Sequence, residues 1–287
     1  MQETVNKLTF EDLTPYLLLK NGNFLYKVPF GNDWAVLKIY YGSRGTFGRL
    51  RKSLANVLYS GQTSYMPKTR CRIERECLAL WRSHGFRVFD SYEDVAVDAP
   101  GCVPGGYLLL EYVEAPKLLD ILQDEQQPLE DRFALYRKFL QEWSHRHDLA
   151  ISEREPRLVH ENGDLGHVMI LDEGFLWFDF EMVYRYPSNV REYVNHEIVQ
   201  YIWDTHKNIP LDIRDRFLDE TVRHYPDRSR LAGVYDHFYN HPNPILRGAR
   251  SFDRRYRKRA QKPTSKYNVV LKLREKLKNS VSGNGAS

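Results

Sequence analysis

The chain of 287 residues is poor in cysteine and has no long uninterrupted hydrophobic run. Its three cysteines, Cys71, Cys77 and Cys102, are odd in number and lack the paired spacing of a metal site. No apolar run approaches the roughly 20 residues that span a bilayer, and residues 1–13 lack the apolar core of a secretory signal. These absences predict a cytoplasmic protein without a transmembrane helix.

Another absence concerns the glycine pattern. The turn at residues 21–23 has one glycine, Gly22, and no Gly-x-Gly-x-x-Gly motif. Backbone N–H groups around it are therefore expected to do any phosphate binding at this turn. Composition itself is ordinary, because 42% hydrophobic and 13% aromatic residues suffice for a hydrophobic core.

The most informative segment is residues 160–181, where polar side chains lie at both ends of an apolar hairpin. Residues 168–171 and 175–178 predict two short strands, and Asp172-Glu-Gly between them is a turn signal. A turn this tight brings His167, before the first strand, next to Asp179, after the second. Both side chains are therefore expected to face one metal ion.

Upstream, residues 34–41 predict a strand that carries Lys38, and residues 70–84 predict a helix that ends at Gly85. The expected apolar stripe of this helix contains Glu76, and Glu74 lies on its flank. Because an acid on an apolar stripe needs a cation, Glu76 is the predicted partner of Lys38, with Glu74 as the alternative.

In this order the segments resemble the kinase-like superfamily, and in particular the bacterial lipopolysaccharide core kinases that act on Kdo or heptose. Aminoglycoside phosphotransferases are a more distant resemblance. The resemblance to the kinase-like superfamily spans roughly residues 15–205. It rests on the order of a strand lysine, a helix glutamate, a His-containing loop and a hairpin ending in Asp-Phe. It implies an α+β, two-lobed protein-kinase-like fold that uses ATP and Mg²⁺, with Mn²⁺ as the alternative ion.

The resemblance also implies domains and roles. Residues 1–113 would form the nucleotide-binding N-lobe, with an antiparallel sheet and one helix. Residues 114–246 would form the helical C-lobe, which contains the catalytic loop, and residues 247–287 a basic tail. Lys38 would bind the α and β phosphates, Glu76 would hold Lys38, and Glu111 to Val113 would form the hinge behind the purine.

Three positions depart from the family pattern. Spacing from His160 puts Asn162 where the family has its catalytic aspartate, yet an amide accepts no proton at neutral pH. Asp164 is therefore the predicted base or hydroxyl-orienting group, and Asn162 assists it. His167 occupies the metal position, although Mg²⁺ prefers oxygen ligands; a purely hydrogen-bonding role for His167 is the alternative. Glu181 replaces the glycine of Asp-Phe-Gly and is expected to support the ion.

The C-lobe prediction rests on amphipathic spacing. Apolar residues at intervals of three and four predict a long central helix over residues 131–149, and two more helices over residues 191–205 and 210–224. Only about ten residues separate Glu181 from the predicted helix over residues 191–205. That leaves no room for the long activation segment of a protein kinase.

The basic tail is the remaining feature. Residues 247–278 hold 13 of the 42 basic residues and two of the 38 acidic ones, so the rest of the chain is mildly acidic. The apolar residues from Tyr267 to Leu277 predict an amphipathic helix that lies on an anionic membrane surface. Nucleic-acid binding through Tyr256 and Tyr267, and simple solvation, are the competing explanations.

Together with these patterns, the resemblance implies an ATP-dependent phosphotransferase that phosphorylates a sugar hydroxyl of a lipopolysaccharide core or related glycolipid. We expect it in the cytoplasm, peripheral to the inner membrane. A nucleotide-binding pseudokinase and an atypical protein kinase are the alternatives. The sequence does not indicate the oligomeric state.

Overall fold

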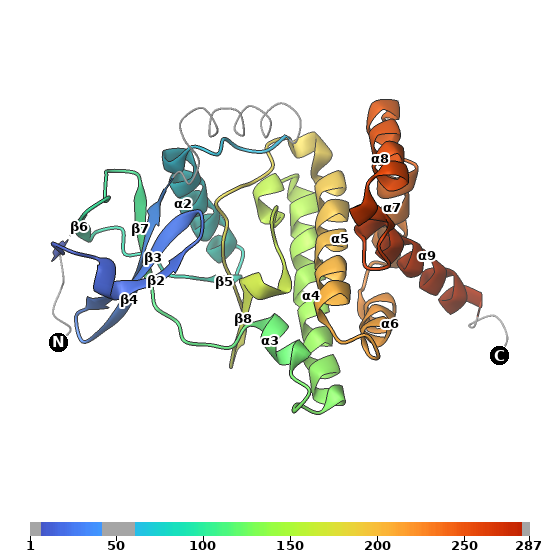
Figure 1. Ribbon diagram of the computed structural model, residues 1–287, viewed down its shortest axis with the longest axis horizontal. Coiled ribbons are helices and arrows are strands. Elements are labelled where there is room, and N and C mark those ends of the chain that lie inside the picture. Colours follow the sequence, from blue (N-terminus) through green and yellow to red (C-terminus); the bar gives the residue numbers. More distant parts are fainter. Residues whose placement is uncertain (1–6, 42–60, 283–287) are drawn as a thin grey trace. The chain divides into compact units, whose positions relative to one another are not determined.

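The strand that carries Lys38 lies inside a four-stranded antiparallel sheet with the order β2-β3-β4-β7. The structure is a computed structural model that describes residues 7–41 and 61–282 (Figure 1). Residues 1–6 of the segment examined for a signal, and residues 283–287 of the basic tail, lie outside the described part. Contacts divide the chain into one unit of residues 1–115 with 171–185, and a second unit of residues 116–170 with 186–287.

In the part of the chain that the structure describes, the first unit contains this sheet, a two-stranded sheet, two strands of a three-stranded sheet and one long helix. Its elements are β1 (Lys7–Thr9), η1 (Thr14–Tyr16), β2 (Leu17–Lys20), β3 (Asn23–Phe30), β4 (Asp33–Tyr40), α2 (Pro67–Ser83), β5 (Arg87–Val88), β6 (Ala96–Asp98), β7 (Tyr107–Glu111) and β9 (Gly174–Trp177). β1 pairs with β6, and β5 pairs with β9, both in parallel.

Alternation along β4 sends its residues to two faces of the sheet. Ala35, Leu37 and Ile39 enter a hydrophobic core with Val28 of β3 and Leu109 of β7. Lys38 and Tyr40, which alternate with Leu37 and Ile39 along the strand, face the other way and meet helix α2. The strand therefore buries one apolar face and presents a lysine on the other.

Helix α2 begins with Pro67, which suits the first turn of a helix because its missing N–H is not needed there. Its buried face includes Cys71, Cys77 and Trp81. The Trp81 ring lies 4.4 Å from that of Phe180 and 5.8 Å from that of Trp177. Residues 171–185, distant in sequence, thus complete the core of the first unit beneath α2.

The second unit is mostly helical (Figure 1). Its elements are α3 (Leu118–Gln123), α4 (Leu129–Glu153), η2 (Pro156–Leu158), η3 (Leu165–His167), β8 (Val168–Leu171, whose last residue is grouped with the first unit), η4 (Pro187–Asn189), α5 (Val190–Asn208), α6 (Arg214–His224), α7 (Arg228–Tyr239), α8 (Pro244–Tyr256), η5 (Lys258–Gln261) and α9 (Lys266–Ser282).

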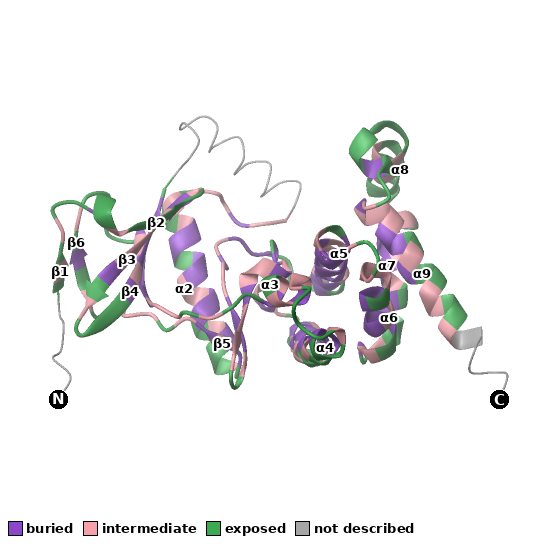
Figure 2. Ribbon diagram, turned by 60° about the horizontal axis from the view of Figure 1, so that its bottom comes forward, coloured by how far each residue is buried: buried purple, intermediate pink, exposed green. Residues whose placement is uncertain are grey.

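Helix α4 is the centre of this unit, and the predicted apolar spacing is confirmed. Phe133, Tyr136, Phe139 and Trp143 are all buried, and the Tyr136 hydroxyl shares a hydrogen bond of 2.9 Å with Thr221 on α6. Figure 2 shows α4 and α5 with extensive buried faces and α8 largely exposed. An antiparallel sheet with one helix, followed by a helical unit, confirms the predicted α+β class.

The prediction for the last helix is wrong in one respect. Val269, Val270 and Leu273 of α9 are at most 2% exposed, because α9 packs against α5, α6 and α7. Lys272 pairs with Asp215 at 3.0 Å, and Lys276 pairs with Asp219 at 2.5 Å. The apolar side predicted to lie on lipid is thus part of the core, since it has three helices to pack against. No helix in the described residues is long and apolar enough to cross a membrane.

Candidate active site

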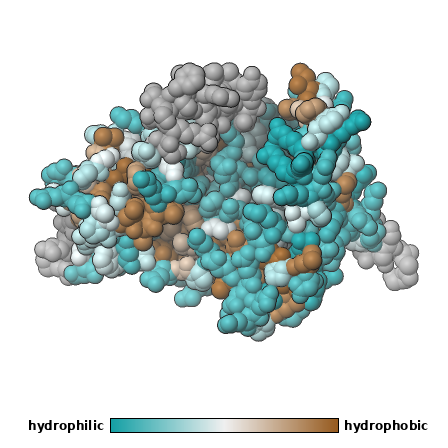
Figure 3. Space-filling model, in the orientation of Figure 1, coloured by the Kyte–Doolittle hydropathy of each residue, from teal (hydrophilic) through white to brown (hydrophobic). Residues whose placement is uncertain are grey.

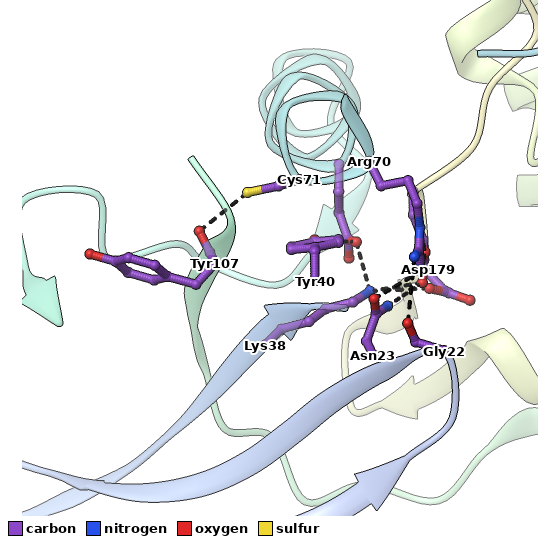
Figure 4. Close-up of polar contacts among 10 residues, drawn as sticks. Gly22, Asn23, Lys38, Tyr40, Arg70, Cys71, Tyr107 and Asp179 are labelled. Atoms are coloured by element: carbon purple, nitrogen blue, oxygen red, sulfur yellow. Dashed lines mark hydrogen bonds and ion pairs between the residues drawn. The ribbon is translucent and has the colours of Figure 1, made fainter. Parts of the chain in front are cut away.

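Lys38 is the centre of a buried charge cluster in the first unit, and its ion-pair partners among the described residues belong to that unit. It is 5% exposed. Its Nζ lies 2.6 Å from Glu74 Oε2, 3.1 Å from Asp179 Oδ1 and 3.6 Å from Glu181 Oε1. Figure 4 shows Lys38, on its strand, pointing toward helix α2 and toward the segment that carries Asp179. The structure therefore brings together the predicted lysine and the predicted metal aspartate.

The predicted partner of Lys38, Glu76, is wrong, and the alternative Glu74 takes its place. Glu74 is 2% exposed and accepts a second hydrogen bond, of 2.5 Å, from the Tyr40 hydroxyl. Glu76 lies on the solvent side of α2, where Arg72 pairs with it at 3.4 Å. The buried stripe of α2 runs through Arg70, Glu74 and Cys77, so it is rotated away from position 76.

Charge sets the protonation of this cluster. Burial lowers the pKa of Lys38, but the carboxylates of Glu74, Asp179 and Glu181 outweigh burial and raise that pKa above its ordinary value. Burial, together with the charge of Glu74, raises the pKa of Tyr40. Lys38 is thus a permanent ammonium group and Tyr40 a permanent hydroxyl donor to Glu74.

Arg70 is a second cation of the cluster, and sequence reasoning missed its role. Its guanidinium pairs with Glu181 and donates to Asn23 Oδ1 at 2.8 Å. Asn23 Nδ2 also donates to Glu181 Oε1 at 2.6 Å. Burial and the nearby Asp179 raise the pKa of Glu181, opposed by Lys38 and Arg70. Arg70 and Asn23 thereby fasten the turn before β3 to the segment after β9.

Asp179 has an uncommon backbone conformation. Its φ is +75°, a left-handed value that side-chain-bearing residues adopt at a cost of roughly 1 kcal/mol or more. Such strain persists when the surroundings hold the residue, and it is frequent at functional sites. Here the Lys38 contact holds the Asp179 carboxylate, which keeps 31% of its side-chain surface exposed.

The oxygen atoms of this cluster suit a hard divalent cation. Glu74, Asp179 and Glu181 each offer a carboxylate oxygen, all within 4.8 Å of one another, and Mg²⁺ prefers carboxylate and phosphate oxygens. Glu74 is held by both Lys38 and Tyr40 and keeps 3% of its side-chain surface exposed, whereas Asp179 and Glu181 keep 31% and 15% and are the two acids that an ion could reach. The residues present therefore fit Mg²⁺ or Mn²⁺.

The predicted catalytic loop lies in the second unit, and a buried ion pair holds the backbone at the start of this loop. Glu197 of α5 is fully buried, pairs with Arg146 of α4 and accepts from the backbone N–H of His160 at 2.9 Å. Burial opposes the charge on Glu197, but Arg146 and His147 outweigh it and hold the pKa of Glu197 below its usual range. His160 is buried as well, which agrees with a packing role beneath the loop.

The rest of the loop is shaped by a close approach and a cap. A Cβ at Gly163 would lie 2.6 Å from the Tyr201 hydroxyl and 2.7 Å from the His160 ring, so only glycine fits. Asp164 caps η3 by accepting from the N–H of Gly166 at 2.9 Å, and His167 Nδ1 lies 3.4 Å from Asp164 Oδ1. The structure thus brings together the predicted base and the predicted histidine ligand of the metal.

Two other predicted positions have definite surroundings. Asn162 is exposed at the tip of the loop. Glu111 ends β7, where its carboxylate binds Arg87 at 2.6 Å and the N–H of Asp90 at 2.7 Å. Val113 follows β7 and is half-buried. The Glu111 side chain therefore serves the first unit, and the proposed hinge contacts would use the backbone.

The chain is similar to known proteins in its structure and not in its sequence. No family model and no curated protein matches the chain. The structure is similar to that of WaaP in complex with acyl carrier protein, with 12% identity and a TM-score of 0.43 over 76% of this chain and 85% of that one. It is also similar to the Rio2 kinase-ADP/Mg²⁺-phosphoaspartate complex from Chaetomium thermophilum, with 14% identity and a TM-score of 0.41 over 94% and 70% of the two chains.

Proposed function

We propose that the protein is an ATP-dependent phosphotransferase whose acceptor is a sugar hydroxyl, carried by a lipopolysaccharide core or a related glycolipid. The observation that carries the proposal is the contact of one buried lysine, Lys38, with both a helix glutamate and the strained Asp179. An ammonium group can bind the phosphates of a nucleoside triphosphate, and neighbouring carboxylates can bind its divalent cation.

Each residue of the cluster has a separate task in this proposal. Glu74, which also accepts a hydrogen bond from the Tyr40 hydroxyl, holds the ammonium of Lys38 in place, so that it can donate hydrogen bonds to the α and β phosphates. Asp179 and Glu181 would hold the divalent ion, which neutralises charge on the phosphates when bound. Arg70 and Asn23 orient Glu181 through an ion pair and a hydrogen bond.

In the second unit, Asp164 would orient the acceptor hydroxyl, with Asn162 assisting. The cap that Asp164 forms on η3 limits its rotation, and the Glu197 hydrogen bond to His160 fixes the start of the loop. Phosphoryl transfer has a loose transition state, so positioning and charge contribute more than base strength. His167, beside Asp164, would support the ion or the loop.

The segment after Asp179 favours a small acceptor. Met182, Val183 and Tyr184 are buried, and η4 begins at Pro187. A protein kinase needs a long peptide-binding segment at this point. A sugar hydroxyl needs no such platform.

The test is turnover of ATP by the purified protein with Mg²⁺ or Mn²⁺ and sugars, glycolipids or proteins as acceptors. Asp179→Ala should abolish turnover and weaken binding of the Mg²⁺–ATP complex. Asp164→Asn should lower turnover about 100-fold while nucleotide binding persists. Asp172→Asn, which removes an exposed carboxylate from the turn between β8 and β9, is the matched control and should act as wild type.

Other outcomes favour the alternatives. Nucleotide binding without turnover, for either ion and every acceptor, would identify a pseudokinase-like module. Phosphate on serine or threonine side chains of an added protein, detected by mass spectrometry, would identify a protein kinase.

A further inference from the structure

In helix α8, arginine side chains face the protein and apolar side chains face solvent, which is the reverse of an ordinary surface helix. Three of its arginines bind the adjoining α7 and the turn after it. Arg247 donates to the carbonyl of His241 at 2.9 Å, Arg250 lies 3.2 Å from the His237 ring nitrogen, and Arg254 donates to the carbonyl of Phe238 at 3.2 Å. The arginines therefore attach the helix to the second unit.

The apolar residues of α8 face solvent instead. Ile245 is 79% exposed, Phe252 60% and Tyr256 61%. With Ala249 they recur at intervals of four, three and four residues, which places them on one face of the helix. The rings of Phe252 and Tyr256 lie 4.7 Å apart. We call these four residues the α8 stripe. Figure 3 shows hydrophobic surface over α8 beside strongly hydrophilic surface.

Basic residues adjoin the α8 stripe and the segment that follows it. Arg255, Arg257, Lys258 and Arg259 are all exposed. The one acidic residue between positions 244 and 262 is Asp253, and it is bound by Arg257 at 2.8 Å and by the Tyr267 hydroxyl at 3.1 Å. This surface therefore carries a net positive charge as well as exposed apolar side chains.

A hollow next to this surface is basic too. It has a volume of about 490 Å³ and is lined in part by Asp253 and by Arg259 of η5. The other charged groups in its lining are Lys207, Lys262 and Lys266. The ammonium groups of Lys207 and Lys266 both lie within 5.2 Å of the Trp203 ring. The chemistry of this hollow suits a phosphate ester.

We propose that α8 is the membrane-docking element of the protein, and that its occupant is the surface of an anionic phospholipid bilayer. A bilayer surface offers an apolar layer and a layer of phosphates within a few ångströms of each other. The α8 stripe enters the boundary between headgroups and acyl chains, and the basic residues and the hollow bind headgroup phosphates. This surface is separate from the Lys38 cluster, and the proposal does not depend on the phosphotransferase activity.

Deleting the whole basic tail is an unsuitable test, since it would remove the buried residues of α9. Point variants avoid this difficulty. Ile245→Glu with Phe252→Glu places two charges on the α8 stripe, where both side chains are exposed, so the fold should persist. The control is Leu211→Glu, because Leu211 is 71% exposed and lies before α6, outside the α8 stripe. Circular dichroism and thermal unfolding of each variant verify the fold.

The measurement is co-sedimentation with vesicles of phosphatidylcholine alone or mixed with phosphatidylglycerol. Wild type and the Leu211 variant should bind the mixed vesicles equally, with much weaker binding to pure phosphatidylcholine. The double variant should bind the mixed vesicles at least tenfold more weakly. Arg255→Gln with Lys258→Gln should weaken binding and reduce its dependence on salt.

Two results would overturn the proposal: wild type that does not bind the mixed vesicles, or a folded double variant that binds as wild type does. Binding of an acidic soluble protein through the α8 stripe, without vesicle binding, would assign the surface to a protein partner instead.

Discussion

The two glutamates of helix α2 offer a matched test of the charge cluster. Glu74→Gln and Glu76→Gln each remove one negative charge from the same helix, two residues apart. Only Glu74 lies against Lys38, at 2.6 Å, and that pair is nearly inaccessible to solvent. Glu76 pairs with Arg72 on the exposed side. The two variants therefore separate a buried contact from a surface contact at constant net charge.

The magnitudes follow from burial. Removing one partner of a buried ion pair costs about 3–5 kcal/mol, because the other charge stays buried. Asp179 and Glu181 remain within 3.6 Å of Lys38, so the expected loss for Glu74→Gln is about 3 kcal/mol, at the low end of that range. An exposed pair four residues apart on a helix contributes about 0.3–0.5 kcal/mol. Glu76→Gln should therefore be almost neutral.

The assay is urea unfolding, followed by titration with the Mg²⁺–ATP complex. The midpoint of unfolding of the first unit should fall by about 1 M or more for Glu74→Gln and should change little for Glu76→Gln. Once residue 74 is neutral, it no longer supplies the charge nearest to Lys38, and the remaining carboxylates lie at 3.1 and 3.6 Å, so nucleotide affinity should fall at least tenfold. Equal effects of the two substitutions, or a larger effect at position 76, would refute the assignment of Glu74.

Two further predictions concern the second unit. Burial lowers the pKa of His147 to about 4. Between pH 6.5 and 4 the unfolded chain therefore binds a proton at this histidine that the folded chain does not. The contribution of His147 makes the free energy of unfolding fall as pH falls, by about 1.4 kcal/mol per pH unit. Unfolding measured from pH 7 to 4 should show a shallower slope for His147→Asn; an unchanged slope in this variant contradicts the prediction. Leu273→Ala should cost about 2–5 kcal/mol, and Leu271→Ala, at a position 41% exposed, should stay within about 0.5 kcal/mol; similar losses would argue against a core role for α9.

The sequence predicted the elements that have long or regular apolar patterns. The apolar run in residues 34–41 and the helical spacing in residues 131–149 correspond to β4 and α4. The cap of Asp164 on η3 was not predicted, although it joins two residues that are close in sequence. Regular apolar patterns are therefore accessible without coordinates.

The buried face of α2 was not accessible in the same way. Counting Leu80 and His84 as core rotates the stripe toward Glu76, whereas both are only half-buried. Arg70, which sets the true face, reads as a surface residue because its counterion, Glu181, is 111 residues away. A pairing over that distance leaves no periodic signal.

The basic tail shows a related limit. A count of charges treats every arginine alike, yet Arg250 and Arg254 bind α7 and its end while Arg255 faces solvent. The apolar residues of α8 and α9 are also alike in composition. Only the packing partners show that those of α9 are internal and those of α8 external.

The discontinuity of the first unit bears on how the protein is made. Residues 1–115 leave the ribosome long before residues 171–185, so the sheet and α2 emerge with Lys38 next to Glu74 but without Asp179 and Glu181. Until those two carboxylates arrive, Arg70 lacks its anionic partner and Trp81 lacks the aromatic rings of Trp177 and Phe180. During synthesis, the nascent N-terminal unit therefore has an incomplete core at Trp81 and an incomplete charge cluster at Lys38, and both are completed only when residues 171–185 arrive.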